Sequence, residues 1–257
     1  MTVMRDSGSS NMDATTIDCR LCGGKSVKTF SHKVIAKYDV DYFQCDTCDG
    51  IQTEEPYWLD EVYTSDIQPE DSNYLSRNLG VFHTVRYFLK HLSIKSDPVV
   101  LDFGGGLGLV PRLLREHGVN AFNHDTYTVS PFVDVKWDGS SPDFIVSSEV
   151  FEHLAEPASE IDALFAHQPD YVYVRTWRYF GQGRDWEYFG PEHGAHVFIY
   201  TDKSMQHIAA KYGYVVELLN EVDVLFCKRP LSGFEKRVVI AGLESRAARA
   251  FLKIARR

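Results

Sequence analysis

The sequence predicts an α/β protein in which helices cover both faces of a mainly parallel sheet, preceded by a small cysteine-bearing module. Apolar strand-like runs alternate with segments of helical periodicity between residues 96 and 230, a pattern typical of parallel sheets. Four glycines fall within five positions directly after the first of these strands. Two C-x-x-C pairs lie near the N-terminus. With 257 residues, the chain is long enough for one sizeable domain and one accessory module.

The elements of the larger domain are expected in a regular order. A helix over residues 72–93 is indicated because apolar side chains recur there at helical spacing. Strands are expected at residues 98–103, 119–125, 131–137, 143–151 and 170–177. Helices are expected at residues 109–118, 158–168 and 201–213, the last of them capped by Thr201 or Asp202. Residues 214–221 and 223–229 are expected to close the sheet as an antiparallel pair.

Composition divides the chain into five segments. Residues 1–16 are small and polar and lack the apolar stretch of a signal peptide, so a flexible tail and a cytoplasmic location are expected. Residues 17–53 form the cysteine module, and residues 54–95 form an acidic, aromatic connector with the first helix. The sheet domain occupies residues 96–230, and residues 231–257 form a basic helix.

The glycine run in "LDFGGGLG" indicates a place where a ligand approaches the backbone. Glycine costs about 0.5–1 kcal/mol relative to alanine where the backbone is fixed, and a glycine-rich turn before a helix is typical of nucleotide sites. The spacing does not match the G-x-G-x-x-G dinucleotide fingerprint. It does match D-x-G-x-G-x-G at Asp102, Gly104, Gly106 and Gly108. A tight turn without a ligand is the alternative.

Two further features fall at the ends of predicted strands. Asp125 ends the second strand, where a carboxylate can accept hydrogen bonds from both hydroxyls of a ribose. An Asp at such a position can also be a simple turn residue. The segment "SSEVFEHLAEP", residues 147–157, follows the fourth strand. It is therefore expected at the ligand-binding edge of the sheet.

These motifs together resemble class I S-adenosylmethionine-dependent methyltransferases, over about residues 75–228. The resemblance implies a Rossmann-like seven-stranded sheet and S-adenosylmethionine as cofactor. It implies that the glycine motif holds the methionine part and that Asp125 holds the ribose. It also implies that the loop after the fourth strand, with Glu149, faces the reacting centre. Asp138 is the expected acidic contact to the adenine.

The cysteine module predicts a zinc site. Cys19 and Cys22 form one C-x-x-C pair, and Cys45 and Cys48 form the other after 22 intervening residues. Four thiolates in a tetrahedron are the usual closed zinc site, which leaves no open coordination position, so the zinc is expected to be structural. Two disulfides are the alternative, disfavoured by the absence of an export signal.

A four-Cys module before this core resembles the sugar C-methyltransferases of deoxysugar pathways and methyltransferases of polysaccharide and secondary-metabolite assembly. In the former, a motif similar to "PEHGAH" carries a catalytic base. That implies His193 as the base, Glu192 as its orienting partner and His196 as a second possibility. The residues after 230 are too few for the extra C-terminal domain of those enzymes, so O- and C-methylation both stay open.

The acceptor is expected to contact a long insert between the last parallel strand and the next helix, residues 175–201. The insert is rich in aromatic residues, His and Arg. Aromatic faces pack well on sugar rings, and Arg178 and Arg184 are expected to bind phosphate or carboxylate. A small sugar-containing molecule is the expected acceptor.

The charge distribution bears on other partners. The net charge of −9 argues against nucleic acid. From Lys228 onward, however, nine Lys and Arg face two Glu. The basic C-terminal helix is expected either to contact a membrane surface or partner protein, or to pack on the acidic body. An RNA or protein methyltransferase and a catalytically silent cofactor-binding protein remain alternatives.

Overall fold

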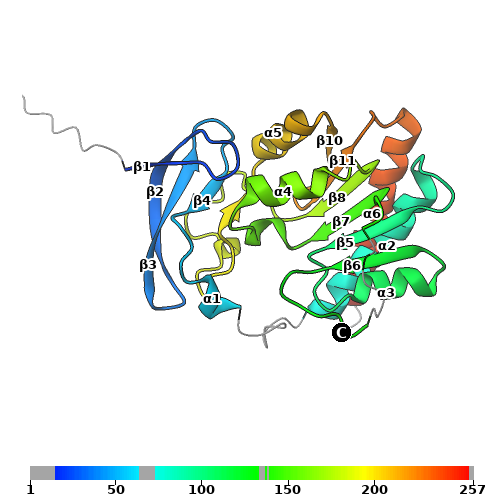
Figure 1. The fold of residues 1–257 in the computed structure, drawn as a ribbon, viewed down its shortest axis with the longest axis horizontal. Helices are drawn as coiled ribbons and strands as arrows, with labels where there is room; N and C mark the ends of the chain where they lie inside the picture. Colours follow the sequence, from blue (N-terminus) through cyan, green and yellow to red (C-terminus); the bar gives the residue numbers. More distant parts are fainter. Residues whose placement is uncertain (1–14, 64–72, 133–136, 138, 255–257) are drawn as a thin grey trace, which may run out of the picture.

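The computed structural model describes residues 15–63, 73–132, 137 and 139–254, with side chains described up to residue 243. The chain forms two sheets, a smaller one near the N-terminus and a larger one flanked by helices (Figure 1). The predicted α/β fold with a mainly parallel sheet and a small N-terminal module is confirmed.

The larger sheet has the strand order β10-β11-β8-β7-β5-β6. Its strands from β5 to β8 run parallel, whereas β11 is antiparallel to β8 and β10 is antiparallel to β11. The predicted antiparallel closing pair is therefore confirmed. The strands in chain order are β5 (Val99–Phe103), β6 (Asn120–His124), β7 (Phe144–Ser148), β8 (Tyr171–Arg175), β10 (Val215–Leu218) and β11 (Asp223–Cys227).

The strand expected at residues 131–137 lies largely outside the described residues. Asp138, the expected adenine contact, lies outside them as well. The described part of the larger sheet therefore has six strands, and the seventh stays a prediction.

Helices cover both faces of this sheet, because successive strand side chains point to opposite sides. Phe144 packs with α2 (Tyr74–His91), α3 (Leu109–Glu116) and α6 (Gly233–Ile254). Its neighbour Ile145 packs with α4 (Pro157–Phe165) and α5 (Asp202–Tyr212). The Thr201 side chain caps α5 by accepting a hydrogen bond from the N–H of Ser204. The predicted helices are thus all present, within a few residues of their expected ends.

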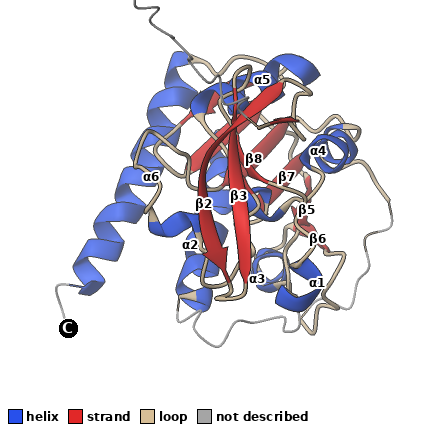
Figure 2. Ribbon diagram, turned by 90° about the vertical axis from the view of Figure 1, so that its left-hand side faces the viewer, coloured by secondary structure: helices blue, strands red, loops and turns tan. Residues whose placement is uncertain are grey.

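The smaller sheet has the order β1-β2-β3-β4-β9, and β2 and β3 are its long strands (Figure 2). Four strands come from the cysteine module: β1 (Thr16–Asp18), β2 (Lys25–Val34), β3 (Tyr38–Cys45) and β4 (Ile51–Thr53). The fifth, β9 (Phe198–Ile199), comes from the long insert and pairs antiparallel with β4. The cysteine module and the insert therefore form the smaller sheet together.

The residues after the module also pack on the insert. Trp58, just before the short helix α1 (Leu59–Val62), is 1% exposed and donates a 2.8 Å hydrogen bond from its ring to the Gly194 carbonyl. Trp58 shares a buried cluster with Val34 from the module and Phe189 from the insert. This part of the expected connector is thus an ordered part of the core.

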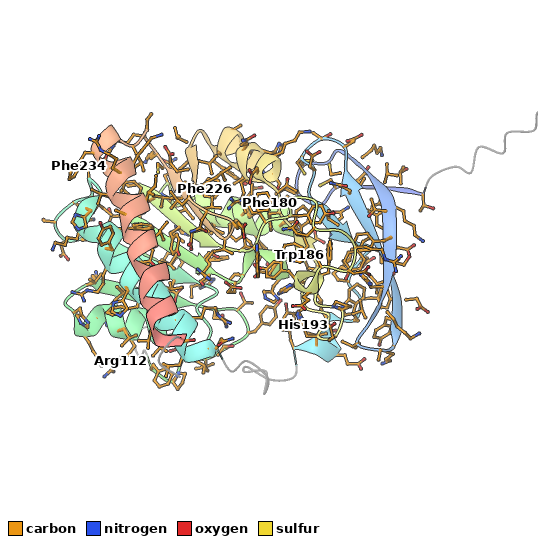
Figure 3. The ribbon with its side chains drawn as sticks, turned by 180° about the vertical axis from the view of Figure 1, so that it is seen from behind. Arg112, Phe180, Trp186, His193, Phe226 and Phe234 are labelled. Atoms are coloured by element: carbon orange, nitrogen blue, oxygen red, sulfur yellow. The ribbon has the colours of Figure 1, made fainter. Side chains whose placement is uncertain are left out.

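The C-terminal helix α6 lies against α2 on the body of the protein, as Figure 3 shows from behind. Val239 and Leu243 are buried in the same core cluster as α2. A Cβ at Gly242 would strike the ring of Tyr87 in α2, so the two helices approach closely. The first half of α6 therefore packs on the body, one of the two expected alternatives. Among the described helices, none combines the length and the apolarity needed to cross a membrane.

Candidate active site

The glycine run forms a left-handed turn between β5 and α3. Gly104, Gly106 and Gly108 have φ angles of +70°, +53° and +76°, in a region that residues with a Cβ rarely adopt. A Cβ at Gly104 would strike Val150. A Cβ at Gly108 would strike the Ser130 hydroxyl. At Gly106, by contrast, no atom lies within 4 Å of the Cβ position. The turn is packed on both flanks and leaves open space at its middle.

Asp125, directly after β6, fixes this turn. Its Oδ2 accepts a 2.9 Å hydrogen bond from the N–H of Gly106. Its Oδ1 accepts hydrogen bonds from the N–H groups of Tyr127 at 2.9 Å and Thr128 at 2.8 Å. A carboxylate has about four acceptor positions, so Asp125 keeps room for a ligand hydroxyl. The structure thus places Asp125, the residue predicted to bind the ribose, beside the predicted glycine motif.

Two polar side chains lie beneath the turn on paired positions of β5 and β6. Asp102 is 3% exposed, and its pKa is raised to about 7 by burial and by the nearby Asp125 carboxylate. Asn123 donates a 3.0 Å hydrogen bond to the Gly106 carbonyl. Its Oδ1 is buried and, within the described structure, has no hydrogen-bond partner. An unpaired buried acceptor costs about 1–3 kcal/mol, which fits a site completed by a ligand or by water.

Glu149 is held in a strained conformation at the end of β7. Its φ angle is +57°, and such strain in a residue other than glycine is common at ligand sites. Its N–H donates to the Arg175 carbonyl at 2.8 Å, and the Arg175 guanidinium donates to its carboxylate at 3.1 Å. Burial and the nearby Glu152 raise the pKa of Glu149 to about 7. Glu149 therefore lies where predicted, one residue before the Val150 side chain that packs on Gly104.

A second cluster forms where the short helix η1 (Phe151–His153) meets the insert. Glu152, His153 and His196 each present one oxygen or nitrogen atom, and these atoms lie within 4.8 Å of one another. We call these three residues the Glu–His–His cluster. His153 donates from Nδ1 to the Ala195 carbonyl at 3.0 Å, and His196 donates from Nδ1 to the Tyr188 carbonyl at 2.5 Å. In the neutral rings, each Nε2 therefore carries a lone pair.

Burial keeps both rings neutral. It lowers the pKa of His153 to about 4 and the pKa of His196 well below its usual range. The buried Glu152 accepts a 2.5 Å hydrogen bond from the Tyr188 hydroxyl on Oε1. Its Oε2 has no hydrogen-bond partner among the residues described, and burial raises its pKa. No role was predicted for Glu152 or Tyr188, although Glu152 lies within the segment 147–157 expected at the ligand-binding edge.

His193, the predicted base, lies on the insert (Figure 3), and its Nδ1 is engaged by a backbone donor. The Ala195 N–H donates to Nδ1 of His193 at 3.1 Å, so a neutral ring carries its proton on Nε2. His193 therefore offers a donor rather than a lone pair. Glu192 is exposed, and the described structure contains no hydrogen bond between it and His193. His196, the second possibility, has the free lone pair that a base requires.

The two predicted anion-binding arginines have other partners. Arg178 is 2% exposed, forms a 2.7 Å ion pair with Asp202 at the start of α5, and donates to the Asn220 carbonyl at 2.6 Å. Arg178 is therefore buried and anchors the insert, and its expected contact with the acceptor stays a prediction. Arg184 is exposed and pairs with its neighbour Asp185.

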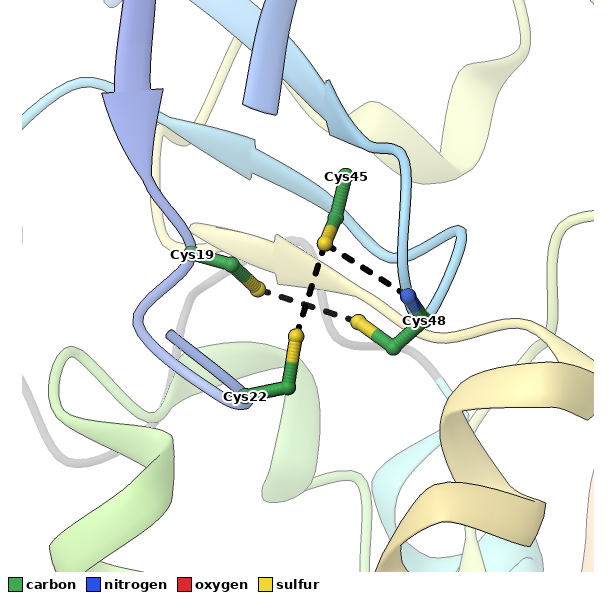
Figure 4. A group of neighbouring side chains, drawn as sticks. All are labelled: Cys19, Cys22, Cys45 and Cys48. Atoms are coloured by element: carbon green, nitrogen blue, oxygen red, sulfur yellow. Dashed lines mark hydrogen bonds between the residues drawn. The ribbon is translucent and has the colours of Figure 1, made fainter. Parts of the chain in front are cut away.

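The four paired cysteines converge as predicted (Figure 4). The Sγ atoms of Cys19 and Cys48 lie 3.7 Å apart, and those of Cys22 and Cys45 lie 3.4 Å apart. In a tetrahedral site with zinc–sulfur bonds of about 2.3 Å, neighbouring sulfurs lie about 3.8 Å apart. The close pairs each join one knuckle to the other, and all four cysteines are free thiols. The arrangement has the size and chemistry of a tetrahedral zinc site.

Comparison with known proteins places this geometry in a family. Residues 77–219, more than half of the chain, match the family model described as "Methyltransferase domain". No curated protein matches the chain significantly. Among solved structures, the Burkholderia thailandensis 1,6-didemethyltoxoflavin-N1-methyltransferase, with bound S-adenosylhomocysteine, is similar in fold. The two sequences are 13% identical, the match covers 77% of this chain and 97% of the other, and the TM-score is 0.50.

A second similar structure is the magnesium protoporphyrin IX methyltransferase of Synechocystis PCC 6803. It is 13% identical, with coverage of 67% of this chain and 95% of the other and a TM-score of 0.41. The match to the family model spans the glycine turn, Asp125, Glu149 and the Glu–His–His cluster. The chain is therefore a member of the methyltransferase domain family.

Proposed function

We propose that the protein is an S-adenosylmethionine-dependent methyltransferase and that its acceptor is a sugar or a nucleotide-linked sugar. The observation that carries the proposal is the left-handed glycine turn with open space at Gly106, fixed by Asp125 at the carboxyl edge of the sheet. When bound, the sulfonium of the cofactor supplies an activated methyl group. The chain must then align the acceptor and take its proton, since positioning and proton removal are the remaining tasks.

The residues around the turn fit the cofactor. The bare backbone at Gly106 leaves room for the methionine part, and Asp125 has a free acceptor position for the ribose. Asp102 provides a buried carboxyl and Glu149 a partly buried one near the place expected for the sulfonium. The adenine contact by Asp138 stays part of the proposal.

Replacing residues of the turn is expected to weaken cofactor binding. Asp125→Ala loses a charge-assisted hydrogen bond and releases the Gly106 N–H, which should cost roughly 1.5–3 kcal/mol, or about ten- to a hundredfold in affinity. Gly106→Val should abolish binding because it fills the open space and disfavours the positive φ angle. Calorimetry with S-adenosylhomocysteine measures both effects, and Asp125→Asn is the control that keeps an acceptor oxygen. Tight binding of NAD, or unchanged affinity in Asp125→Ala, would contradict the proposal.

The two raised carboxyl pKa values predict a pH dependence that separates cofactor from product. Asp102 and Glu149 both have pKa values of about 7, so they ionise between about pH 6 and pH 8. The cofactor is a sulfonium cation, whereas the product is a neutral thioether, so only the cofactor gains attraction as the carboxylates form. The affinity ratio of S-adenosylmethionine to S-adenosylhomocysteine should rise several-fold across this range.

Calorimetry at several pH values tests this ratio, and Glu149→Gln should flatten part of the rise. The same pKa shifts predict that the unliganded protein loses stability as pH rises from about 4 to about 7. In that interval the unfolded chain has already released the protons that the folded chain still holds. A ratio that does not change with pH would remove these carboxyls from the neighbourhood of the sulfonium.

The insert supports a ring-shaped polar acceptor. Trp177 is 41% exposed and contacts the rings of Trp186 and Tyr188. Tyr188 in turn contacts the ring of His196. An exposed aromatic face thus leads to the Glu–His–His cluster, and such faces pack on sugar rings. We propose that this cluster contacts the acceptor oxygen and activates it.

The acceptor can be identified by its turnover. Formation of S-adenosylhomocysteine should be measured across a panel of nucleotide-sugars, with tRNA and a protein extract as comparison substrates. Turnover with one or more nucleotide-sugars is expected. Turnover confined to RNA or protein would replace the proposed acceptor, and cofactor binding without any turnover would favour a silent binding protein.

The four cysteines are proposed to hold one structural zinc ion in the module at residues 17–53. The support is the sulfur spacing and the C-x-x-C sequence pattern. The Cys22 and Cys45 sulfurs also accept hydrogen bonds from the N–H groups of Gly24 and Thr47 at 3.4 Å. These donors favour thiolates over thiols, which suits a metal ligand.

A further inference from the structure

We propose that Glu152, His153 and His196 bind a second divalent cation, separate from the four cysteines, and that this cation holds the acceptor's hydroxyl oxygen. The ion is a first-row transition metal such as Zn²⁺ or Fe²⁺. The role at the acceptor rests on the proposed function, whereas the binding of the metal does not.

The donor set selects this class of metal. Two imidazole nitrogens and one carboxylate oxygen are the ligands of catalytic zinc sites and of non-haem iron sites with open positions. Magnesium and calcium prefer oxygen ligands alone. Glu152 is fully buried, while both histidines are partly exposed. We propose that an acceptor oxygen or a water reaches the cluster from the side of the histidines.

Each ligand is already oriented by a hydrogen bond from its other polar atom. Tyr188 orients two of the three, because its hydroxyl donates to Oε1 of Glu152 and its carbonyl accepts from Nδ1 of His196. The Ala195 carbonyl accepts from Nδ1 of His153. Metal-binding histidines commonly make this second contact to a carbonyl, which fixes the tautomer that presents Nε2 to the metal.

The second carboxylate oxygen of Glu152 has no partner. Oε2 of Glu152 is buried and makes no hydrogen bond to any described residue. An unpaired buried carboxylate oxygen is costly, and a bound cation would satisfy it. Two ligands at about 2.1 Å from one ion lie at most about 4.2 Å apart. In a tetrahedral site the same ligands lie about 3.4 Å apart, so atoms that now lie within 4.8 Å of one another would have to approach by up to about 1.4 Å.

The local charge is compatible with a cation. Glu149 is paired with Arg175, whereas no salt bridge reaches Glu152 within the described ranges. The positive charge of Arg77 also acts on both carboxyls and opposes a cation, so the three ligands have to offset it. The three ligands include one carboxylate, so a bound divalent ion would keep a positive charge that attracts an acceptor oxygen.

Cobalt binding to the full-length protein tests the proposal. Co²⁺ should be added to protein whose cysteine site is filled with zinc, followed by gel filtration, elemental analysis and absorption spectroscopy. We expect one further equivalent of metal with visible d–d bands and without the intense near-ultraviolet band of a cobalt–thiolate bond. Glu152→Gln and His196→Gln should each lose this equivalent while keeping the zinc. His117→Gln, an exposed histidine at the end of α3, should retain it.

Each outcome decides between the two proposals. The metal site is wrong if the wild type binds no further cobalt, or if both variants bind it as the wild type does. If no cobalt binds but His196→Gln slows turnover, the metal proposal fails while the proposed function stands. If cobalt binds at the cluster but no acceptor turns over, the metal proposal stands while the proposed function fails. Unchanged affinity for S-adenosylhomocysteine shows that each variant is folded, and His153→Gln replaces any variant that is not.

Discussion

Cys48→Ser is expected to remove the zinc and to disorder the smaller sheet together with the insert that completes it. Structural zinc sites contribute on the order of 10 kcal/mol of apparent binding free energy, which is coupled to folding. Since β9 belongs to this sheet, the loss should extend to the insert and abolish turnover. Elemental analysis should find at least one zinc per chain fewer in the variant than in the wild type. Limited proteolysis should then cut the variant within the insert.

Cys227→Ala is the matched control, because Cys227 is a buried thiol of the larger sheet that belongs to neither C-x-x-C pair. It should keep the zinc and the protease resistance of the insert. The larger sheet should survive in Cys48→Ser, so some affinity for S-adenosylhomocysteine should remain. A metal-free wild type that is fully folded, with four thiols that react quickly, would show that the site is not a structural zinc centre.

His196→Gln is expected to lower the turnover rate by roughly 10²–10⁴-fold, the usual effect of losing a group that activates a hydroxyl. The affinity for S-adenosylmethionine should hardly change, because the residues proposed to bind the cofactor lie around the glycine turn. His193→Gln should lower the rate by less than about tenfold, because the amide of Gln can replace the Nε2–H donor that His193 offers. Steady-state kinetics and calorimetry together distinguish the two variants.

Which of His193→Gln and His196→Gln loses more of the turnover rate decides which histidine acts on the acceptor. If His193→Gln lost the larger part of the rate, the ring of His193 would have to turn during the reaction and free its Nδ1 from the Ala195 N–H. Equal loss of rate and of cofactor affinity in His196→Gln would mark that residue as structural. Tyr188→Phe removes the hydroxyl that holds Glu152 and should lower the rate in the same direction as His196→Gln.

The larger sheet was predictable from the sequence because its signals are local. Short stretches of sequence contain the helical periodicity of α2 and the capping residues of α5, Thr201 and Gly213. The glycine turn was predictable for the same reason, since its spacing places three positive φ angles in one loop. Asp125 follows from its place at the end of a strand.

The chemistry of the insert was not predictable, because it depends on contacts between distant segments. Which nitrogen of His193 or His196 carries the proton is decided by Ala195 and Tyr188 through the fold of the loop. In the sequence Arg178 is a candidate to bind an anionic ligand, yet in the structure it is buried and forms an ion pair with Asp202. The pairing of β9 with β4 has no local signal, since two residues suffice to form β9.

Strand β9, which the insert contributes to the smaller sheet, also affects how the chain folds during synthesis. The hydrogen bond from Trp58 to Gly194 joins residues 136 positions apart. Domains usually fold in order as they leave the ribosome, but this N-terminal unit cannot bury Trp58 or complete its sheet until most of the chain has been made. Contacts of such long range slow folding and leave apolar surface exposed in the meantime. We therefore expect the cysteine module, which is synthesised before the larger sheet, to be among the last parts to reach its final structure.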